Sequence, residues 1–507
     1  MEVFMKYITI FLFLGLATQS IAQVSQPNRL EIELKNYEQK FLVVSAEERG
    51  LILTRQVQNT ETRRENKYEV YHIDTAFNIE YHDFLFVETK FTLKGYDVFD
   101  EQFYMLFEYM GSRPEFYLVR MNLIDYSINT FQFESQLPLA LTEFEIIENT
   151  IVLGGFVNSR PTVVTYFFGE NKPKVLPGFY NNKSELLQIE MEDDKGVFHT
   201  ISAFKTDRGR KALNLKTFDT NGNTVKDINI DPTDDYSLLY GRATSLKGEA
   251  LLVTGTYTKK RLDMSRGLFI ARVNPNGEYV INYYNFADLK NFFNYMKAKR
   301  EKRVRERIER RKIKGKKNKF NYRLLVHDIV ERNGRFIMVG EAYYPKYSYN
   351  SFYAGSFSYG NPYNNNYGQI FDGYKYTHAV VIGFDRRGRL MWDNSFEVND
   401  VVSWTLDQYV HVSHKKDKTA LLYLYDNEIR TKIIEKDDVV EGKSFDELKL
   451  SFDYDEVKND SGREYGGLED WYDNTFYAYG VQNLSNKRDR GVKLNREVFF
   501  INKIIYE

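Results

Sequence analysis

The amino-acid sequence predicts an all-β protein built from repeated sheet units, and two observations support this fold class. Short apolar strands recur roughly every 50 residues, and Asn, Asp or Gly follows many of them. The 507 residues include 39 Tyr and 38 Phe but 10 Pro. Aromatic side chains fit the pleated, half-buried surface of a sheet, so the composition also favours strands.

The repeat contains two strands. The first often ends in a small residue followed by polar residues, and the second comes roughly 10–15 residues later. First strands begin at eight positions, which are Leu42, Phe103, Ile151, Val197, Leu251, Phe336, Ala420 and Phe476. The clearest second strands are Phe116–Met121, Thr162–Phe167, Leu268–Val273, Ala379–Phe384 and Val498–Ile501. Eight repeats of this kind occupy most of the chain.

Three segments of the repeat contain matching turns, at Phe218–Asn223, Val273–Glu278 and Phe384–Arg389. Each contains a Gly, and a Gly at the left-handed position of a hairpin turn explains the pattern without a ligand. The oxygen side chains of Asp219–Asn223 could hold Ca²⁺, but a Glu at the twelfth position is missing. We therefore predict a plain turn there.

This pattern resembles the β-propeller, whose blades have about 40–50 residues and four strands. The resemblance implies seven or eight blades, because strands from the two termini can close one blade together. It also implies that the small residue of the first strand lies near the central channel. Neither Trp392-Asp393, which lacks a Gly-His partner, nor Gly154-Gly155 identifies a WD40 or kelch subfamily. Two β-sandwich domains in tandem are the alternative.

Residues 1–22 have the features of a cleavable signal peptide, and residues 23–507 are then the propeller. Lys6 precedes an apolar stretch, Tyr7–Ala17, which is shorter than the about 20 residues that span a bilayer. Ser20 and Ala22 provide small residues for cleavage. We expect an exported protein that is periplasmic, outer-membrane-associated or extracellular, without a transmembrane span after cleavage. An uncleaved anchor helix is the alternative.

The chain has no cysteine. A bacterial lipoprotein needs a Cys directly after its signal, so lipid anchoring by that route is excluded. Disulfides, thiol catalysis and Cys-ligated metals are excluded as well. The fold therefore depends on its core alone, which a chain of this length can supply.

Residues 288–319 form a first insertion, which we predict to be a basic helix. Residues 297–319 hold fourteen Lys and Arg against three Glu, a charge of +11 in a chain whose net charge is −1. One interpretation is a solvated helix that packs Phe292, Phe293 and Met296 on a blade. The other is a contact with lipid phosphates, acidic polysaccharide or an acidic protein. The candidate contact residues are Arg300, Arg303, Arg307, Arg310 and Arg311.

Residues 343–376 form a second insertion that is rich in Tyr, Asn, Gly and Ser and almost uncharged. We predict a loop that is either a partner-binding surface or a disordered spacer, because Tyr, Asn and Ser make adaptable contacts. The candidate contact residues are Tyr347, Tyr349, Tyr353, Tyr359 and Tyr363. Both insertions lie in consecutive repeats, so we expect them to form one composite site.

No catalytic motif is evident. Gly-x-Ser-x-Gly, a P-loop and H-E-x-x-H are all missing from the sequence. His411 and His414 could hold a metal, but an exposed pair without metal is the simpler interpretation. With 71 acidic residues, a glycosidase pair cannot be chosen by sequence alone. We expect neither a cofactor nor a metal, and the oligomeric state stays open.

The sequence therefore favours a non-enzymatic interaction or scaffold protein of the cell envelope or exterior. Its expected partner is an envelope protein or an anionic glycan or lipid surface. Nucleic acid is disfavoured by the signal peptide. The alternatives are a propeller that binds or cleaves polysaccharide, and a peripheral binder of anionic membranes.

Overall fold

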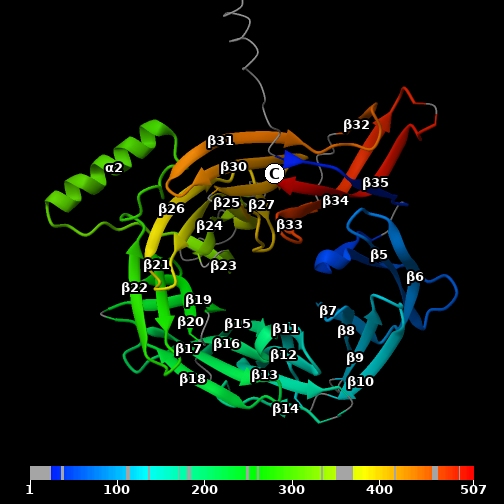
Figure 1. The fold of residues 1–507 in the computed structure, drawn as a ribbon, viewed down its shortest axis with the longest axis horizontal. Coiled ribbons are helices and arrows are strands. Elements are labelled where there is room, and N and C mark those ends of the chain that lie inside the picture. The colour runs from blue at the N-terminus through cyan, green and yellow to red at the C-terminus, as the bar shows by residue number, and fades with distance from the viewer. Residues whose placement is uncertain are drawn as a thin grey trace, which may run out of the picture.

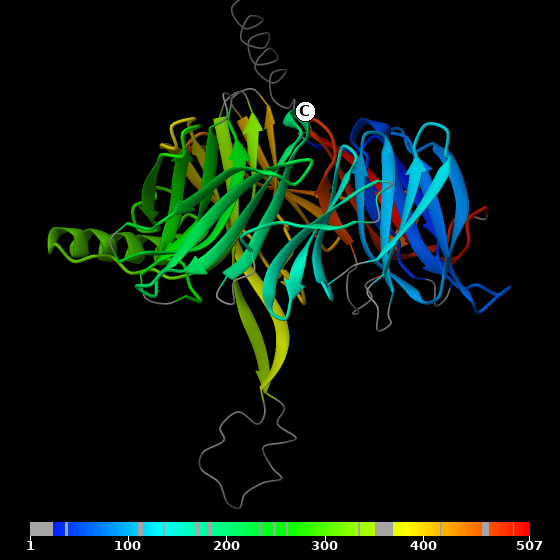
Figure 2. The same cartoon turned by 90° about the horizontal axis from the view of Figure 1, so that it is seen from below.

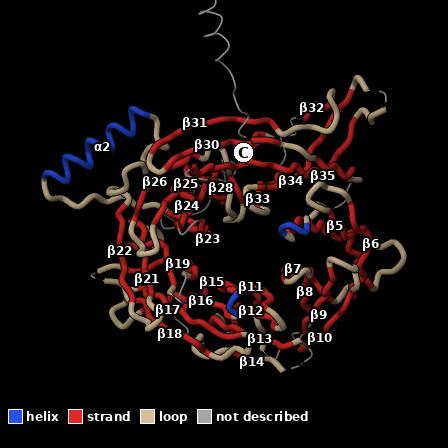
Figure 3. Tube along the Cα trace, in the orientation of Figure 1, coloured by secondary structure: helices blue, strands red, loops and turns tan. Residues whose placement is uncertain are grey.

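Eight sheets surround one central axis in the computed structural model of the protein (Figure 1). The structure describes residues 24–506 except 36–38, 110–114, 135–136, 169, 171, 180–183, 234, 247–249, 260–261, 333–334, 350–368, 416–417, 459–465 and 490. Strands make up most of the described chain, and α2 is the one α-helix within it (Figure 3). The predicted β-propeller is therefore confirmed, with eight blades, and the sheets close into one ring rather than two sandwiches.

Four consecutive strands form each of the first four blades, and all neighbours are antiparallel. Blade 1 contains β3 (Leu42–Ser45), β4 (Leu51–Val57), β5 (Glu65–Ile73) and β6 (Ile79–Glu88). Blade 2 contains β7 (Phe91–Phe99), β8 (Gln102–Tyr109), β9 (Glu115–Asn122) and β10 (Ile128–Glu134). Blade 3 contains β11 (Ala140–Ile147), β12 (Thr150–Val157), β13 (Arg160–Phe167) and β14 (Lys174–Val175). Blade 4 contains β15 (Ser184–Glu192), β16 (Val197–Lys205), β17 (Lys211–Asp219) and β18 (Thr224–Ile230).

Blades 5 to 7 repeat this order. Blade 5 contains β19 (Ser237–Ser245), β20 (Leu251–Thr258), β21 (Gly267–Val273) and β22 (Tyr279–Asn285). Blade 6 contains β23 (Arg323–Arg332), β24 (Arg335–Tyr349), β25 (Gln369–Phe384) and β26 (Leu390–Glu397), with β27 (Val402–Ser403) beside β25. Blade 7 contains β28 (His411–Lys415), β29 (Lys418–Tyr425), β30 (Glu428–Glu435) and β31 (Asp438–Glu447). Short 3-10 turns, η1 (Glu47–Arg49) and η2 (Asp193–Lys195), join inner to second strands in blades 1 and 4.

Blade 8 combines strands from both ends of the described chain. Its later strands are β32 (Asp455–Val457), β33 (Gly466–Asp470), β34 (Thr475–Asn486) and β35 (Asn495–Tyr506). The early strands β1 (Val24–Ser25) and β2 (Arg29–Glu33) both pair with β35. The ring is thus closed by non-covalent pairing between the two ends, as the resemblance to a propeller implies.

Most of the strands predicted to come first in a repeat are the second strand of a blade, counted outward from the axis. Their small residues therefore lie one strand away from the axis. A Cβ added to Gly155 in β12 would lie 2.2 Å from the carbonyl oxygen of Ala140 in β11. A Cβ on Gly255 in β20 would lie 1.9 Å from the oxygen of Tyr240 in β19. These glycines therefore permit a close approach between the second and the innermost strand. They do not themselves line the axis, which corrects the prediction.

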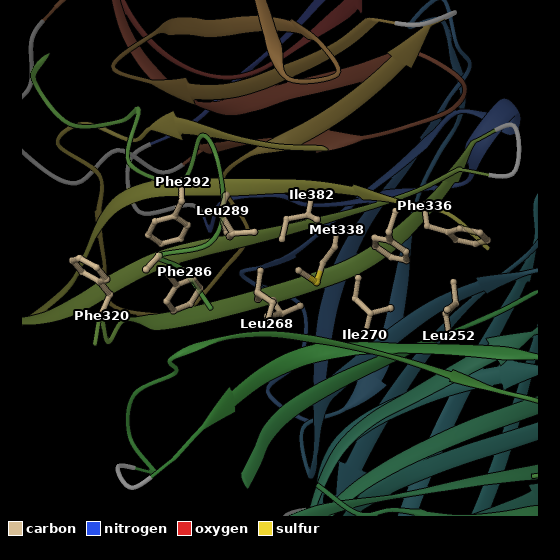
Figure 4. Close-up of a cluster of buried hydrophobic side chains, with 14 of the residues drawn as sticks. Leu252, Leu268, Ile270, Phe286, Leu289, Phe292, Phe320, Phe336, Met338 and Ile382 are labelled. Carbon is tan, nitrogen blue, oxygen red and sulfur yellow. The ribbon is translucent and has the colours of Figure 1, made fainter. Parts of the chain in front are cut away.

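The core lies between neighbouring blades rather than at the centre of the ring. Figure 4 shows one cluster between blades 5 and 6, where Leu268 and Ile270 face Met338 and Ile382. The segment before α2 extends this cluster, because Phe292 and Phe293 are fully buried in it. The prediction that these two side chains pack on a blade is confirmed. They do so from an irregular segment, since α2 spans Ala298–Ile313 and not all of residues 288–319.

The second insertion extends a hairpin. Tyr343 pairs with Tyr376 and Tyr349 pairs with Gln369, so the outer parts of residues 343–376 belong to β24 and β25. The hairpin projects from one face of the ring, whereas α2 lies at the outer rim (Figure 2). Residues 350–368 and the predicted signal peptide, residues 1–22, lie outside the described residues. Among the residues that are described, no helix is long and apolar enough to cross a bilayer.

Candidate functional site

Helix α2 presents a continuous row of cations to solvent. Arg300, Arg303, Arg307, Arg310 and Lys314 recur at intervals of three and four residues. This spacing places them on one side of an α-helix. All five are exposed. We call these five residues the basic stripe.

The opposite side of α2 is held against the protein. Ile308 is buried, and Val304 packs on the same cluster as Phe293 and Phe320. The Nε atom of Arg305 donates to Oε1 of Glu301 at 2.7 Å, an i, i+4 ion pair along the helix. Ile313 at the end of α2 is its one large apolar side chain that is exposed.

The structure gives the five predicted arginines different roles. Arg300 and Arg303 are exposed, and the Arg307 guanidinium lies 5.1 Å from the Phe320 ring centre. Arg310 is exposed too, and its Nε donates to the backbone oxygen of Glu306. Arg311 is half-buried, and its Nη2 donates to the carbonyl oxygen of Lys317 at 2.7 Å. Four of the five thus share the basic stripe, and Arg311 holds the segment that follows the helix.

A cavity of about 330 Å³ lies between blade 5 and the base of this insertion. Its wall includes three tyrosines, Tyr236, Tyr257 and Tyr283, whose ring centres are 4.8 to 5.0 Å apart. The same wall has the amides Asn285 and Asn318. The cationic residues of the lining are Lys259, Arg266, Lys312, Lys316 and Lys317, and the acidic one is Asp288. We call this space the rim cavity.

The cations of the rim cavity are only partly neutralised. Lys312 lies 3.7 Å from Asp288, and the Nη2 of Arg266 donates to the oxygen of Asn318 at 3.4 Å. Lys316 and Lys317 are exposed, and neither makes an ion pair within the described part of the chain. Lys259 also pairs with Asp235 at 3.2 Å, so five cations against Asp288 and this second carboxylate leave a formal charge of +3. Such a cavity attracts anions.

The tyrosines of this wall stay neutral hydrogen-bonding groups. Burial and the neighbouring Tyr236 raise the pKa of Tyr257. Burial also raises the pKa of Tyr283, although its oxygen accepts a hydrogen bond from the Thr233 amide at 3.1 Å. The sequence did not reveal this cavity, because its wall combines strands of blade 5 with a segment about 30 residues later.

The projecting hairpin exposes aromatic side chains. Tyr347 is 50% exposed, and its ring centre lies 5.8 Å from that of Phe371. Phe371 lies 6.0 Å from Trp404, which is 60% exposed. Tyr349 is the last residue of β24. The other three predicted tyrosines of this insertion lie outside the described residues, and these are Tyr353, Tyr359 and Tyr363.

The two insertions do not form the expected composite surface. In Figure 2 the hairpin extends away from one face of the ring, while α2 lies beside the rim at some distance from it. Tyr347 therefore lies apart from the basic stripe. The described parts of the two insertions are therefore separate surfaces.

The histidine pair does not converge. His411 and His414 both lie in β28, three residues apart, so their side chains point to opposite sides of the strand. His411 is buried rather than exposed, and its Nδ1 lies 2.8 Å from Oδ2 of Asp470. Burial opposes its protonation, but the hydrogen bond to Asp470 and the nearby carboxylates raise its pKa. The described residues include no group of three His, Asp or Glu that could hold a metal ion.

Carboxylates gather on the innermost strands of blades 2 to 4. Burial raises the pKa of Asp97 in β7 to about 6, although its Oδ2 accepts a hydrogen bond from the Ile146 amide at 2.6 Å. Burial and the charges of Asp97, Glu143 and Glu190 raise the pKa of Glu145 in β11 to about 8. A protonated acid beside ionised ones is a pattern of acid catalysis, but buried acidic clusters perturb pKa values without catalysis too.

No protein-family model and no curated protein matches the chain. Solved structures share its fold at low identity. The β-propeller domain of the Trilobed protease from Pyrococcus furiosus has 9% identity and a TM-score of 0.37, over 78% of this chain and 95% of that chain. Polysaccharide lyase Uly1 has 10% identity and a TM-score of 0.38, over 95% of this chain and all of that chain. These similarities concern the fold.

Proposed function

We propose that this protein is a non-enzymatic binding protein that holds an acidic polymer along α2. The basic stripe is the observation that carries the proposal. Its ends, Arg300 and Lys314, are fourteen residues apart, which corresponds to about 21 Å at the rise of an α-helix. A row of this length suits a partner with repeated negative charges rather than a single small anion.

The orientation of α2 favours a polymer over insertion into a bilayer. A helix that inserts into a membrane surface buries an apolar side in the lipid. Two of the three large apolar residues of α2, Val304 and Ile308, instead pack on the protein, and Ile313 at its end is the one that is exposed. A single exposed isoleucine among charged residues is too little apolar surface for insertion, so we infer a partner that is held by electrostatic attraction and hydrogen bonds.

An acidic polysaccharide is the partner that we propose. We expect an exported chain, because residues 1–22 have the features of a signal peptide, and anionic glycans rather than nucleic acid are then the expected ligands. Carboxylates repeated along a flexible glycan can pair with successive arginines, each of which can donate two parallel hydrogen bonds. The raised pKa values of Asp97 and Glu145 alone do not support a hydrolase or lyase.

Charge-removing variants test this proposal. We expect the triple substitution R300Q/R303Q/R310Q to weaken binding to polygalacturonate about tenfold or more, because each exposed pair contributes up to about 1 kcal/mol. The control, K172Q/R208Q, removes exposed charges from other blades and should keep most of the affinity. Binding should weaken with added salt, and neutral dextran should not bind.

Two results would count against this function. Equal affinities of the stripe variant and the control would show that α2 is not the contact. Stripe-dependent binding to vesicles with anionic lipid, without binding to polygalacturonate, would show that the partner is a membrane surface.

A further inference from the structure

We infer that the rim cavity binds one acidic sugar residue of the polymer held by α2, an inference that rests on the proposed function. The cavity lies at the C-terminal end of α2, because Lys312 belongs to the last turn and Lys316 follows the helix after Lys314 and Gly315. Helical spacing places Lys312 on the side away from the stripe, so a chain that runs along the stripe would turn round this end of the helix to enter the cavity. Its volume of about 330 Å³ is within the range of small-ligand sites.

The cations of the lining require a negative group on the ligand. Lys316 and Lys317 extend from the segment after α2, and Arg266 reaches the same space from the strand-joining turn of blade 5. A carboxylate placed among them would exchange its water for charge-assisted hydrogen bonds. The same cations would repel a positively charged ligand strongly. A neutral sugar would meet no such repulsion and would only lack the added attraction.

The remaining lining favours a hydroxylated ligand over an apolar acid. Asn285, Asn318 and the hydroxyls of Tyr257 and Tyr283 are polar groups around the same space. Some of these groups already have protein partners, since Tyr283 accepts from the Thr233 amide and Tyr257 is hydrogen-bonded to Asn285. Hydroxyls of a sugar ring can use the donors and acceptors that remain, and the chain of a fatty acid cannot.

The tyrosines provide the third requirement of a sugar site, an aromatic ring against which a sugar can stack; the three rings are tilted to one another by 44 to 77°, so one ring at a time offers its face. Tyr236 and Tyr283 are half-buried, so part of each ring faces the cavity, while Tyr257 is fully buried behind them. The three rings support one another at 4.8 to 5.0 Å, which keeps the surface rigid. A sugar ring can stack its C–H groups on such a wall while its carboxylate faces the lysines.

Calorimetry with short ligands tests the cavity independently of the polymer. We expect the whole chain to bind trigalacturonate, and maltotriose, which has the same length without charge, at least tenfold more weakly. K316Q/K317Q should weaken binding of the acid about tenfold, and Y236L about fivefold, because each variant removes one of the two recognition features. The matched control K299Q/K302Q removes two charges from α2 outside the cavity and should change this affinity less than twofold.

The outcomes separate this inference from the proposed function. If trigalacturonate affinity is the same in all variants, or if inorganic phosphate or sulfate competes as well as the trisaccharide, the sugar site is wrong. If polygalacturonate binding still depends on the basic stripe in that case, the proposed function stands. If trigalacturonate binds through Lys316 and Lys317 but polymer binding ignores the stripe, the cavity stands by itself and the proposed function fails.

Discussion

At the scale of single residues, Glu145 is a carboxylic acid whose pKa is raised far above its ordinary value. It lies on an innermost strand among other carboxylates, and its pKa is raised to about 8. Between its ordinary pKa and pH 8, the folded state holds a proton that the unfolded state has released. Stability contributed by this group is therefore complete at low pH and decreases as the pH rises through that interval.

This environment predicts a pH-dependent effect of Glu145→Gln. At pH 5 the wild-type side chain is protonated and resembles Gln, so urea denaturation should give nearly equal free energies of unfolding. At pH 9 the variant should be more stable by roughly 1 kcal/mol, after allowance for water near the inner strands. The exposed Glu456→Gln serves as the control and should show no pH-dependent difference. A gain of equal size at both pH values would contradict the assignment.

A second prediction at this scale concerns Gly155. Because an added Cβ would meet the backbone oxygen of Ala140 at 2.2 Å, Gly155→Ala forces β11 and β12 apart. We expect a loss of about 2 kcal/mol or more in the free energy of unfolding, as for other overpacked sites. Gly442→Ala in β31 is the control, since a Cβ there meets nothing within 4 Å. Equal melting temperatures of the two variants would refute the close approach.

At the scale of elements, the sequence revealed the central strands of each blade better than their neighbours. Strands such as β12 and β20 are almost entirely buried and have no charged residue, because both of their sides pack on other blades. Outer strands such as β10 are mostly exposed and carry a weaker pattern. The innermost strands were missed for a similar reason, since polar residues such as Glu143 and Glu145 interrupt β11.

The two insertions also show how far the sequence pattern predicts the structure. The charge run correctly predicted a helix, but its start was placed too early because Leu289, Phe292 and Phe293 have helical spacing. These residues are buried in an irregular segment, where contacts with blades 5 and 6 outweigh local preference. Once α2 is known to be a helix, its periodicity is enough to predict the basic stripe. The rim cavity could not be predicted in this way, because tertiary packing alone brings Tyr283 to Lys316.

At the scale of the whole molecule, ring closure depends on the pairing of β2 with β35. Arg29 of β2 is buried at this seam, and its guanidinium donates to Glu31, Asn502 and Gln482 at 2.7 Å each. The terminal strands were expected to close one blade, but the sequence could not show which polar residues lock it. Buried charges of this kind are costly to leave without a partner.

Substitution of Arg29 should therefore weaken the entire ring. We expect Arg29→Ala to lower the free energy of unfolding by about 3 kcal/mol, measured by chemical denaturation, because Asn502 and Gln482 lose a buried donor, although Glu31 keeps Arg496 as its remaining cationic partner. Lys493→Ala removes the exposed ion pair with Glu33 at the same seam and should cost less than about 0.5 kcal/mol. Similar costs for both variants would mean that the buried contacts do not control closure.

The ring also explains why its surfaces act separately. Its blades hold α2 at the rim and the aromatic hairpin on one face, so each can contact a partner without the other (Figure 2).

The most direct test of the central claim is the salt dependence of polygalacturonate binding by the wild type and by R300Q/R303Q/R310Q. We predict that affinity falls steeply with salt for the wild type and clearly less steeply for the variant, because fewer ions are released on binding. Parallel salt dependences with equal affinities would contradict the claim that α2 holds an acidic polymer.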